Sequence, residues 1–284
     1  MDFFKKGISG FTIKILALIF MTFDHIAAFM PQTMQIPIWF HWVGRISAPL
    51  FIFMAVEGFY HTSNRKKYIS RLYIWSVIMA IGNQIINNVF SHPEGAIIIN
   101  NIFSTLFLIA IYLQAIEFIK KFRKEKEIKY FIIGLLMIII PIILGIFTVA
   151  LLFKVTNRVI TLFMILVPVP FLVEGGPIWI ILGIIFYLCR GKKFSLSICY
   201  VLMCIFIFTT MSNGDYSLKN SILQNYQWMM IASLPLMLLY NGEKGKSMKY
   251  LFYLYYPIHV YILYILGIYL ICLLYTSDAA DYLL

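Results

Sequence analysis

The segment "KILALIFMTFDHIAAFM", residues 14–30, is apolar enough to lie in lipid, yet an aspartate and a histidine stand side by side within it. It has the length of a membrane span, and no small-residue cleavage site follows it. These properties favour a membrane-spanning helix over a cleavable signal peptide. They also raise the question of why a membrane helix carries ionisable groups.

The composition of the whole chain agrees with a membrane location. Hydrophobic residues make up 62% of the 284 residues and charged residues 12%, and the mean hydropathy is +0.87. Soluble domains carry about twice that share of charge. Long apolar segments recur from end to end, and the alternating segments of about ten residues that build outer-membrane barrels are absent. We therefore predict an all-α polytopic membrane bundle of about nine to ten transmembrane helices.

Ten apolar segments are candidates for these helices, and several are short or contain proline. They are residues 12–30, 37–60, 68–90, 97–119, 130–150, 158–173, 178–189, 195–211, 228–240 and 255–272. Two crossings between 130 and 173 would put the basic sequence "RGKK" (190–193) outside, against the rule that basic loops stay in the cytoplasm. A single net crossing restores agreement, with "VPVPFLV" (167–173) as a re-entrant or surface segment.

Basic residues alternate from loop to loop along the first half of the chain. The basic positions are Lys5 and Lys6, Arg65–Lys67, and "KKFRKEKEIK" (120–129). The loops 31–36 and 91–96, which separate these positions, contain no lysine or arginine. Because short basic loops stay in the cytoplasm, we predict a cytoplasmic N-terminus and an external 31–36 loop.

Two features of the composition limit the partners. The net charge of +11 comes from short loops rather than from a basic face on a separate domain, so we expect no nucleic-acid partner. The four cysteines lie in apolar stretches without metal-ligand spacing, and we expect buried, unreactive side chains and no metal site. They are Cys189, Cys199, Cys204 and Cys272.

The sequence of the last residues is unlike the C-terminus of a membrane protein. The sequence "CLLYTSDAAD" (272–281) resembles the translated read-through of a transposon adapter used in DNA sequencing libraries. We therefore expect one membrane domain over residues 1–271 and a non-native tail over 272–284. Asp278 and Asp281 are assigned no function.

The first span combines three ionisable residues. Lys14 and His25 share one face of a helix and are separated by about 16 Å along its axis. With the N-terminus inside, Lys14 lies near the cytoplasm and His25 deeper. Lys14 would snorkel to headgroups, and His25 would be a hydrogen-bonded core residue, if neither had a function. Asp24 adds a second group within the span, each costing about 2.5–3.5 kcal/mol at the centre, which favours a functional cavity.

The second span, "WVGRISAPLFIFMAVEGFYHT" (42–62), adds an arginine near its outer end and a glutamate near its inner end. Arg45 and Glu57 do not share a helical face, so each is expected to find its partner on another helix. Asp24 is the natural partner for Arg45, and Lys14 for Glu57. Each pair lies at one end of the spans.

Two further histidines stand near the ends of spans. His61 comes just after Glu57, and His259 lies in "YYPIHVY" (255–261), at the entrance to the last span. We expect an interfacial role for His259 and either substrate contact or a structural role for His61.

Four segments carry a resemblance to a known family: "IKILALIFMTFDHIAAFM" (13–30), "WVGRISAPLFIFMAVEGFYHTSNRKKYISRL" (42–72), "NNIFSTL" (100–106) and "YLFYLYYPIH" (250–259). Together they resemble the TraX family, whose founding member acetylates the N-terminus of conjugative pilin. A more distant similarity is to the acyltransferase 3 family, which has Arg or Lys followed ten residues later by His in its first span. Lys14 and His25 fit that spacing, whereas Glu57 stands where that family has serine.

The resemblance implies a membrane acyltransferase of the bacterial inner membrane that uses cytoplasmic acetyl-CoA. His25 would be the general base that deprotonates the acceptor amine or hydroxyl, with Asp24 or a neighbour orienting its ring. Lys14 would hold the anionic part of coenzyme A, and Arg65 and Lys66 would meet its phosphates. The acceptor is left open between a pilin-like peptide, a glycan and a lipid. Arg45 would bind substrate or be structural.

A transporter or flippase is the alternative. Charged groups within spans and proline-broken helices also mark substrate pathways. No inverted repeat of hydropathy is evident, and the polar groups concentrate in the first two spans. Both features favour the enzyme.

Overall fold

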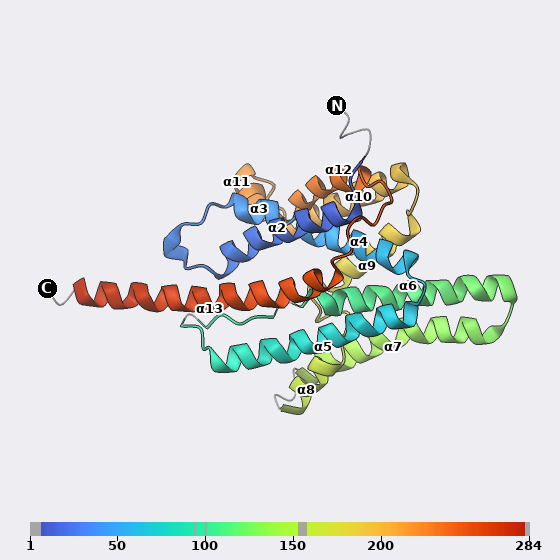
Figure 1. Ribbon diagram of the computed structural model, residues 1–284, viewed down its shortest axis with the longest axis horizontal. Coiled ribbons are helices and arrows are strands. Elements are labelled where there is room, and N and C mark those ends of the chain that lie inside the picture. The colour runs from blue at the N-terminus through green and yellow to red at the C-terminus, as the bar shows by residue number, and fades with distance from the viewer. Residues whose placement is uncertain (1–6, 94, 100, 153–157, 282–284) are drawn as a thin grey trace. The chain divides into compact units, whose positions relative to one another are not determined.

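The computed structural model describes residues 7–93, 95–99, 101–152 and 158–281. Within these ranges the regular elements are helices, drawn in Figure 1, and the single β-type contact is a bridge between Ile8 and Tyr240. The all-α class predicted from the sequence is confirmed. Lys5 and Lys6 lie outside the described residues, as do the last three residues of the predicted tail.

The segments predicted at 97–119, 158–173 and 255–272 differ from the structure by five to nine residues at one or both ends, and the other predicted segments agree to within a few residues with the helices of the structure. They are α2 (Gly10–Phe29), η1 (Gln32–Met34), α3 (Trp39–Gly44), α4 (Ser47–His61), α5 (Arg65–Val89), α6 (Ile102–Glu125), α7 (Ile128–Leu152), α8 (Arg158–Leu166), α9 (Gly176–Leu188), α10 (Lys193–Met211), α11 (Leu218–Leu223), η2 (Gln227–Ser233), α12 (Leu234–Leu238) and α13 (Lys249–Asp281).

Within the described part of the chain, seven helical segments, with α3 and α4 taken together, are long and apolar enough to cross a membrane. The protein is therefore a multi-pass membrane protein. Two shorter apolar helices, Gly176–Leu188 and Gln227–Leu238, complete the set within the described residues. Both of these would also have to cross to reach the lower end of the predicted nine to ten spans.

The region between 130 and 173 contains one helix of spanning length. α7 has 25 residues and stays helical through Pro141. α8 has nine residues, which extend about 14 Å, less than half of the hydrocarbon thickness of roughly 30 Å. Turns follow α8 over residues 168–175. A single crossing here is what the basic loops require, while the orientation itself stays a prediction.

The surface of α7 has the character of a lipid contact. The mean hydropathy of its most apolar 18 residues is 3.0, and only 11% of this stretch is buried within the protein. Large side chains such as Ile143, Ile146 and Phe147 are exposed on it. Exposing so long an apolar surface to water would be unfavourable in free energy, whereas contact with lipid tails carries no such penalty.

The chain forms two compact units. The first contains residues 1–54, 84–98 and 192–284, and the second contains residues 55–83 and 99–191. Two of their boundaries fall inside α4 and α5, and the other two fall in the segments before α6 and before α10. The single domain expected over residues 1–271 stays a prediction.

The second unit is built around the hairpin of α6 and α7, which lie side by side in Figure 1. The hairpin turns at Lys126, whose backbone adopts φ of 59°. Gly134 allows α7 to approach α6 closely, because a Cβ there would lie 3.0 Å from the side chain of Ile119. α9 also packs against α6, where a Cβ at Gly183 would press on Ile109.

In the first unit α2 contacts both α3 and α13. The loop before α13 caps the start of α2, because the N–H of Gly10 donates to the carbonyl oxygen of Glu243 at 2.8 Å. Further along, α13 approaches the end of α2 so closely that a Cβ at Gly267 would overlap the carbonyl oxygen of Phe29. This packing brings side chains of α13 against the polar residues of α2.

Candidate functional site

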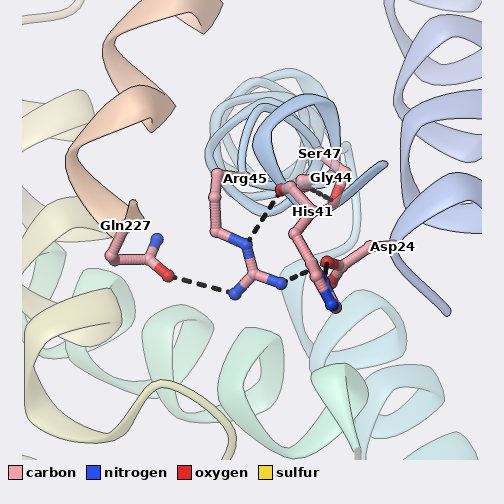
Figure 2. A network of polar contacts seen from close by, with 6 residues as sticks. All are labelled: Asp24, His41, Gly44, Arg45, Ser47 and Gln227. Atoms are coloured by element: carbon pink, nitrogen blue, oxygen red, sulfur yellow. Dashed lines mark hydrogen bonds and ion pairs between the residues drawn. The ribbon is translucent and has the colours of Figure 1, made fainter. Parts of the chain in front are cut away.

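Asp24 and Arg45 form an ion pair, as the sequence analysis predicted (Figure 2). Arg45 Nη2 donates to Asp24 Oδ1, Nη1 donates to Gln227 Oε1 at 3.2 Å, and Nε donates to the carbonyl oxygen of His41 at 3.4 Å. The two charged side chains are 18% and 25% exposed. Each nitrogen of the guanidinium therefore has a protein acceptor, and its charge is compensated by the carboxylate.

His41 is a member of this network that the sequence analysis missed. Its Nδ1 lies 3.0 Å from Asp24 Oδ1 and donates to it. Gly44 lets α3 approach α2, because a Cβ there would overlap the side chain of Asp24. His41 and Arg45 are four residues apart, so they lie on one helical face, and this spacing was the available signal.

His25 and His259 form a second buried polar pair. His25 Nδ1 lies 2.7 Å from His259 Nε2, and the two side chains are buried between α2 and α13. His259 Nδ1 lies 2.7 Å from the carbonyl oxygen of Tyr255, which only accepts, so this nitrogen carries the proton. A neutral His259 then has its lone pair on Nε2 and accepts from His25 Nδ1–H. The unprotonated nitrogen of a neutral His25 is consequently Nε2.

This geometry corrects two expectations. Asp24 or a neighbour was expected to orient the ring of His25; Asp24 instead binds His41 and Arg45, and His259, distant in sequence, is the hydrogen-bond partner of His25. His259 was expected at the entrance to the last span, in an interfacial role. It lies ten residues inside α13 and is buried, because that helix begins at Lys249.

Lys14 lies near the start of α2 and is half-buried. Its Nζ stands 5.3 Å from the centre of the Phe252 ring, in a cation–π contact. No ion pair of Lys14 occurs within the described residues. Its charge is therefore open to an anionic ligand.

Glu57 has a different partner from the one expected. The sequence analysis paired Glu57 with Lys14. In the structure Arg190 donates two hydrogen bonds to the Glu57 carboxylate, from Nε to Oε1 at 2.9 Å and from Nη2 to Oε2 at 3.2 Å. His61 Nε2 lies 2.8 Å from Arg190 Nη2, which donates to it. Such two-pronged pairs are strong and geometrically specific. The glutamate side chain is only 8% exposed, so this triad has the features of a structural link within the second unit.

Arg65 and Lys66 lie at the start of α5 in different environments. Arg65 Nη1 lies 2.9 Å from Glu117 Oε2, and its guanidinium stands 5.1 Å from the Phe59 ring centre. Glu117 also accepts from Lys120 at 3.0 Å. Arg65 is thus already paired within the second unit, whereas Lys66 is exposed. Phosphate binding by either residue stays a prediction.

The cysteines differ from the expectation of buried side chains. Cys204 is buried, Cys189 and Cys199 are half-buried, and Cys272 is exposed. Exposure of Cys272 follows from its place on α13, an apolar helix of spanning length. Within the described residues no three His, Cys, Asp or Glu side chains lie close enough together to hold a metal ion.

A polar cavity of about 500 Å³ adjoins Arg45 and Gln227. The remaining lining residues come from the end of α10, from α11 and from the segments on either side of α11. They are Met211, Ser212, Asn213, Asp215, Asn220, Gln224, Asn225 and Tyr226. The sequence analysis did not anticipate this cavity, because most of its residues lie between the predicted spans 195–211 and 228–240 and match no motif.

These features define a multi-pass, all-α membrane protein whose buried ionisable groups are gathered in pairs and networks. The chain belongs to the TraX family, since the family model described as TraX protein matches residues 9–267. It is also similar to the probable fimbrial assembly protein FimC, serogroup H1, of Dichelobacter nodosus, with 39% identity over 71 residues. That match covers 25% of this chain and 29% of the relative. No solved structure matches the chain.

Proposed function

We propose that the protein is an acyltransferase of the bacterial inner membrane that moves an acetyl group from cytoplasmic acetyl-CoA to an acceptor amine or hydroxyl. Family membership supports the proposal, since the founding TraX protein acetylates pilin. The name of the Dichelobacter relative places it in fimbrial assembly. A pilin-like peptide is accordingly one acceptor class, alongside a glycan or a lipid.

The observation that carries the proposal is the pairing of His25 with His259. The 2.7 Å contact assigns the proton of a neutral His25 to Nδ1 and the lone pair to Nε2. A general base needs such a lone pair on an oriented ring. The buried position of His25 would also exclude water, which otherwise competes with the acceptor for the thioester.

The chemistry follows the usual course of acyl transfer. The acceptor nitrogen or oxygen attacks the thioester carbonyl while His25 Nε2 removes the acceptor proton. The carbon–sulfur bond then breaks, the acetyl group stays on the acceptor, and the coenzyme A thiolate leaves. The imidazolium returns its proton to the thiolate, so the base is restored. His259 acts through His25 by holding its ring and tautomer.

Lys14 has the place and charge to hold the anionic end of the donor. It lies about 16 Å from His25 along α2, on the side predicted to face the cytoplasm. A donor whose charged nucleotide stays at the membrane surface, while its long thioester arm reaches inward, fits that separation. In this proposal Asp24 positions Arg45 and His41 rather than taking part in proton transfer.

The test is transfer of radiolabelled acetyl groups from acetyl-CoA by the purified full chain in proteoliposomes. The expected result is labelling of added peptide, glycan or lipid acceptors, with a loss of about 10²-fold or more in the His25→Ala variant. His92→Ala, outside both polar centres, is the matched control and should retain transfer. Absence of transfer, together with counterflow of an intact solute, would replace this proposal by the transporter alternative.

A further inference from the structure

The cavity beside Arg45 has an unusual lining. Five of its ten lining residues carry a primary amide: Asn213, Asn220, Gln224, Asn225 and Gln227. The volume of about 500 Å³ falls within the range of roughly 300–1,000 Å³ that is typical of small-molecule sites. Each amide offers both a donor and an acceptor. The cavity is therefore suited to a ligand whose own groups both donate and accept.

One of these amides leaves a buried atom without a partner. Asn225 Nδ2 donates to Ser212 Oγ at 2.8 Å and to the carbonyl oxygen of Phe208 at 3.2 Å. Because Ser212 Oγ itself donates to that carbonyl at 2.6 Å, it accepts from Asn225, and the orientation of the amide is fixed. Asn225 Oδ1 has no hydrogen-bond partner within the described residues, and it is itself buried from solvent, so a ligand in the cavity does not reach it. Asn225 therefore shapes the wall, and the exposed amides of the lining are the groups that meet a ligand.

The cavity offers hydrogen-bond acceptors to a ligand on two oxygen-bearing side chains. Asn220 Nδ2 donates to the backbone carbonyl of Asp215 at 2.7 Å, which leaves the Asn220 side-chain oxygen for a ligand. Asp215 Oδ1 accepts the N–H of Ser217 at 2.9 Å, and this hydrogen bond holds the pKa of the carboxyl below its usual range. A carboxylate therefore faces the ligand.

Charge decides which ligands the cavity excludes. Arg45 is the cation of the lining, and its guanidinium is already paired with Asp24 and bonded to Gln227. An anion such as phosphate would be repelled by the Asp215 carboxylate and would find no uncompensated positive charge in the lining. An ammonium ligand would satisfy the oxygens but leave the NH₂ groups of Asn213 and Gln224 without acceptors.

We propose that this cavity binds a neutral, polyhydroxylated ligand of the saccharide class. Hydroxyl groups both donate and accept, so they match the five amides and the carboxylate that line the cavity. The inference concerns binding alone and does not depend on acyl transfer. In the predicted orientation Arg45 lies toward the outside, so the saccharide enters from the external side.

The test is equilibrium binding to the purified full chain. Trp228 adjoins Gln227 in the sequence, and its Nε1 donates to the carbonyl oxygen of Ser221 at 3.0 Å, so its fluorescence reports on the cavity wall. The probes are glucose, N-acetylglucosamine and maltose, with glycinamide and inorganic phosphate as comparison ligands. We expect saturable binding of at least one saccharide and none of the two comparison ligands.

Variants locate the binding. Gln224→Ala removes an exposed lining amide and should weaken saccharide binding tenfold or more. Gln32→Ala, at an exposed glutamine outside the cavity, is the control. Failure of all three saccharides, preference for glycinamide or phosphate, or unchanged binding in Gln224→Ala would overturn the inference. Acetyl transfer measured on the same samples separates this outcome from a failure of the proposed function.

Discussion

His25 Nδ1 lies 2.7 Å from His259 Nε2, and the two imidazoles are joined across α2 and α13, 234 residues apart in the chain. Their planes are inclined by 21°, with ring centres 5.0 Å apart. His259 is anchored in turn to the carbonyl oxygen of Tyr255, one helical turn earlier. This chain of two hydrogen bonds determines which nitrogen of His25 carries the lone pair.

The first prediction concerns His259 as a positioning residue. His259→Phe removes the acceptor for His25 Nδ1–H, so kcat for acetyl transfer should fall by about 10- to 100-fold, with KM for acetyl-CoA unchanged. His259→Gln, whose amide oxygen accepts the same proton, should recover much of that loss. Steady-state kinetics on folded, inserted protein make the comparison. Equal kcat in wild type and His259→Phe would remove His259 from the mechanism.

The second prediction concerns the Asp24–Arg45 pair. Arg45→Gln leaves the partly buried carboxylate without its cation, and Asp24→Asn does the converse. Each should lower the free energy of unfolding by about 1.5–3 kcal/mol, the usual range for hydrogen bonds to charged groups. The double variant should cost less than the sum of the two, because the second change removes a group that is already unpaired. Thermal unfolding in detergent measures all four proteins, and strict additivity would show that the pair contributes no coupling.

Sequence reasoning found the Asp24–Arg45 pair because the spans and their orientation placed both charges at one end. It failed for Glu57, whose partner Arg190 belongs to a basic cluster that the positive-inside rule already explained. It also missed the burial of His259 beside His25, because a helix start judged from hydropathy put that residue at the interface. Partners on distant segments depend on how helices pack, and hydropathy alone does not report packing.

The third prediction concerns orientation. Gln32 in η1 and Asn64 before α5 are both exposed, and they lie on opposite sides of one predicted span. An impermeant thiol reagent applied to intact cells should label a cysteine at Gln32 and spare one at Asn64. The four native cysteines are first replaced, since Cys272 is exposed. The reverse pattern of labelling would invert the topology and place Lys14 outside.

The fourth prediction concerns the tail. α13 extends to Asp281, well beyond the point at which the sequence ceases to resemble a membrane protein. If residues 272–284 are an adapter scar, they have no evolved contacts, so deleting 273–284 should leave the unfolding temperature and acetyl transfer unchanged. A deletion of equal length at 261–272 is the control and should abolish folding, because it removes Tyr264 and Ile271 from the core. A large loss of stability on removing 273–284 would show that the tail is part of the protein.

The last prediction concerns Lys14, which has a cation–π contact with Phe252 but no ion pair within the described residues. Lys14→Ala should raise KM for acetyl-CoA about tenfold while kcat at saturation stays near that of wild type, because the lysine binds the donor but does not touch the reacting atoms. Lys14→Arg keeps the charge and should be tolerated. Lys120→Ala, which removes a cation of the second unit, is the control. If Lys14→Ala instead lowers kcat at unchanged KM, the lysine acts near the chemistry, and the proposed placement of coenzyme A at the start of α2 is wrong.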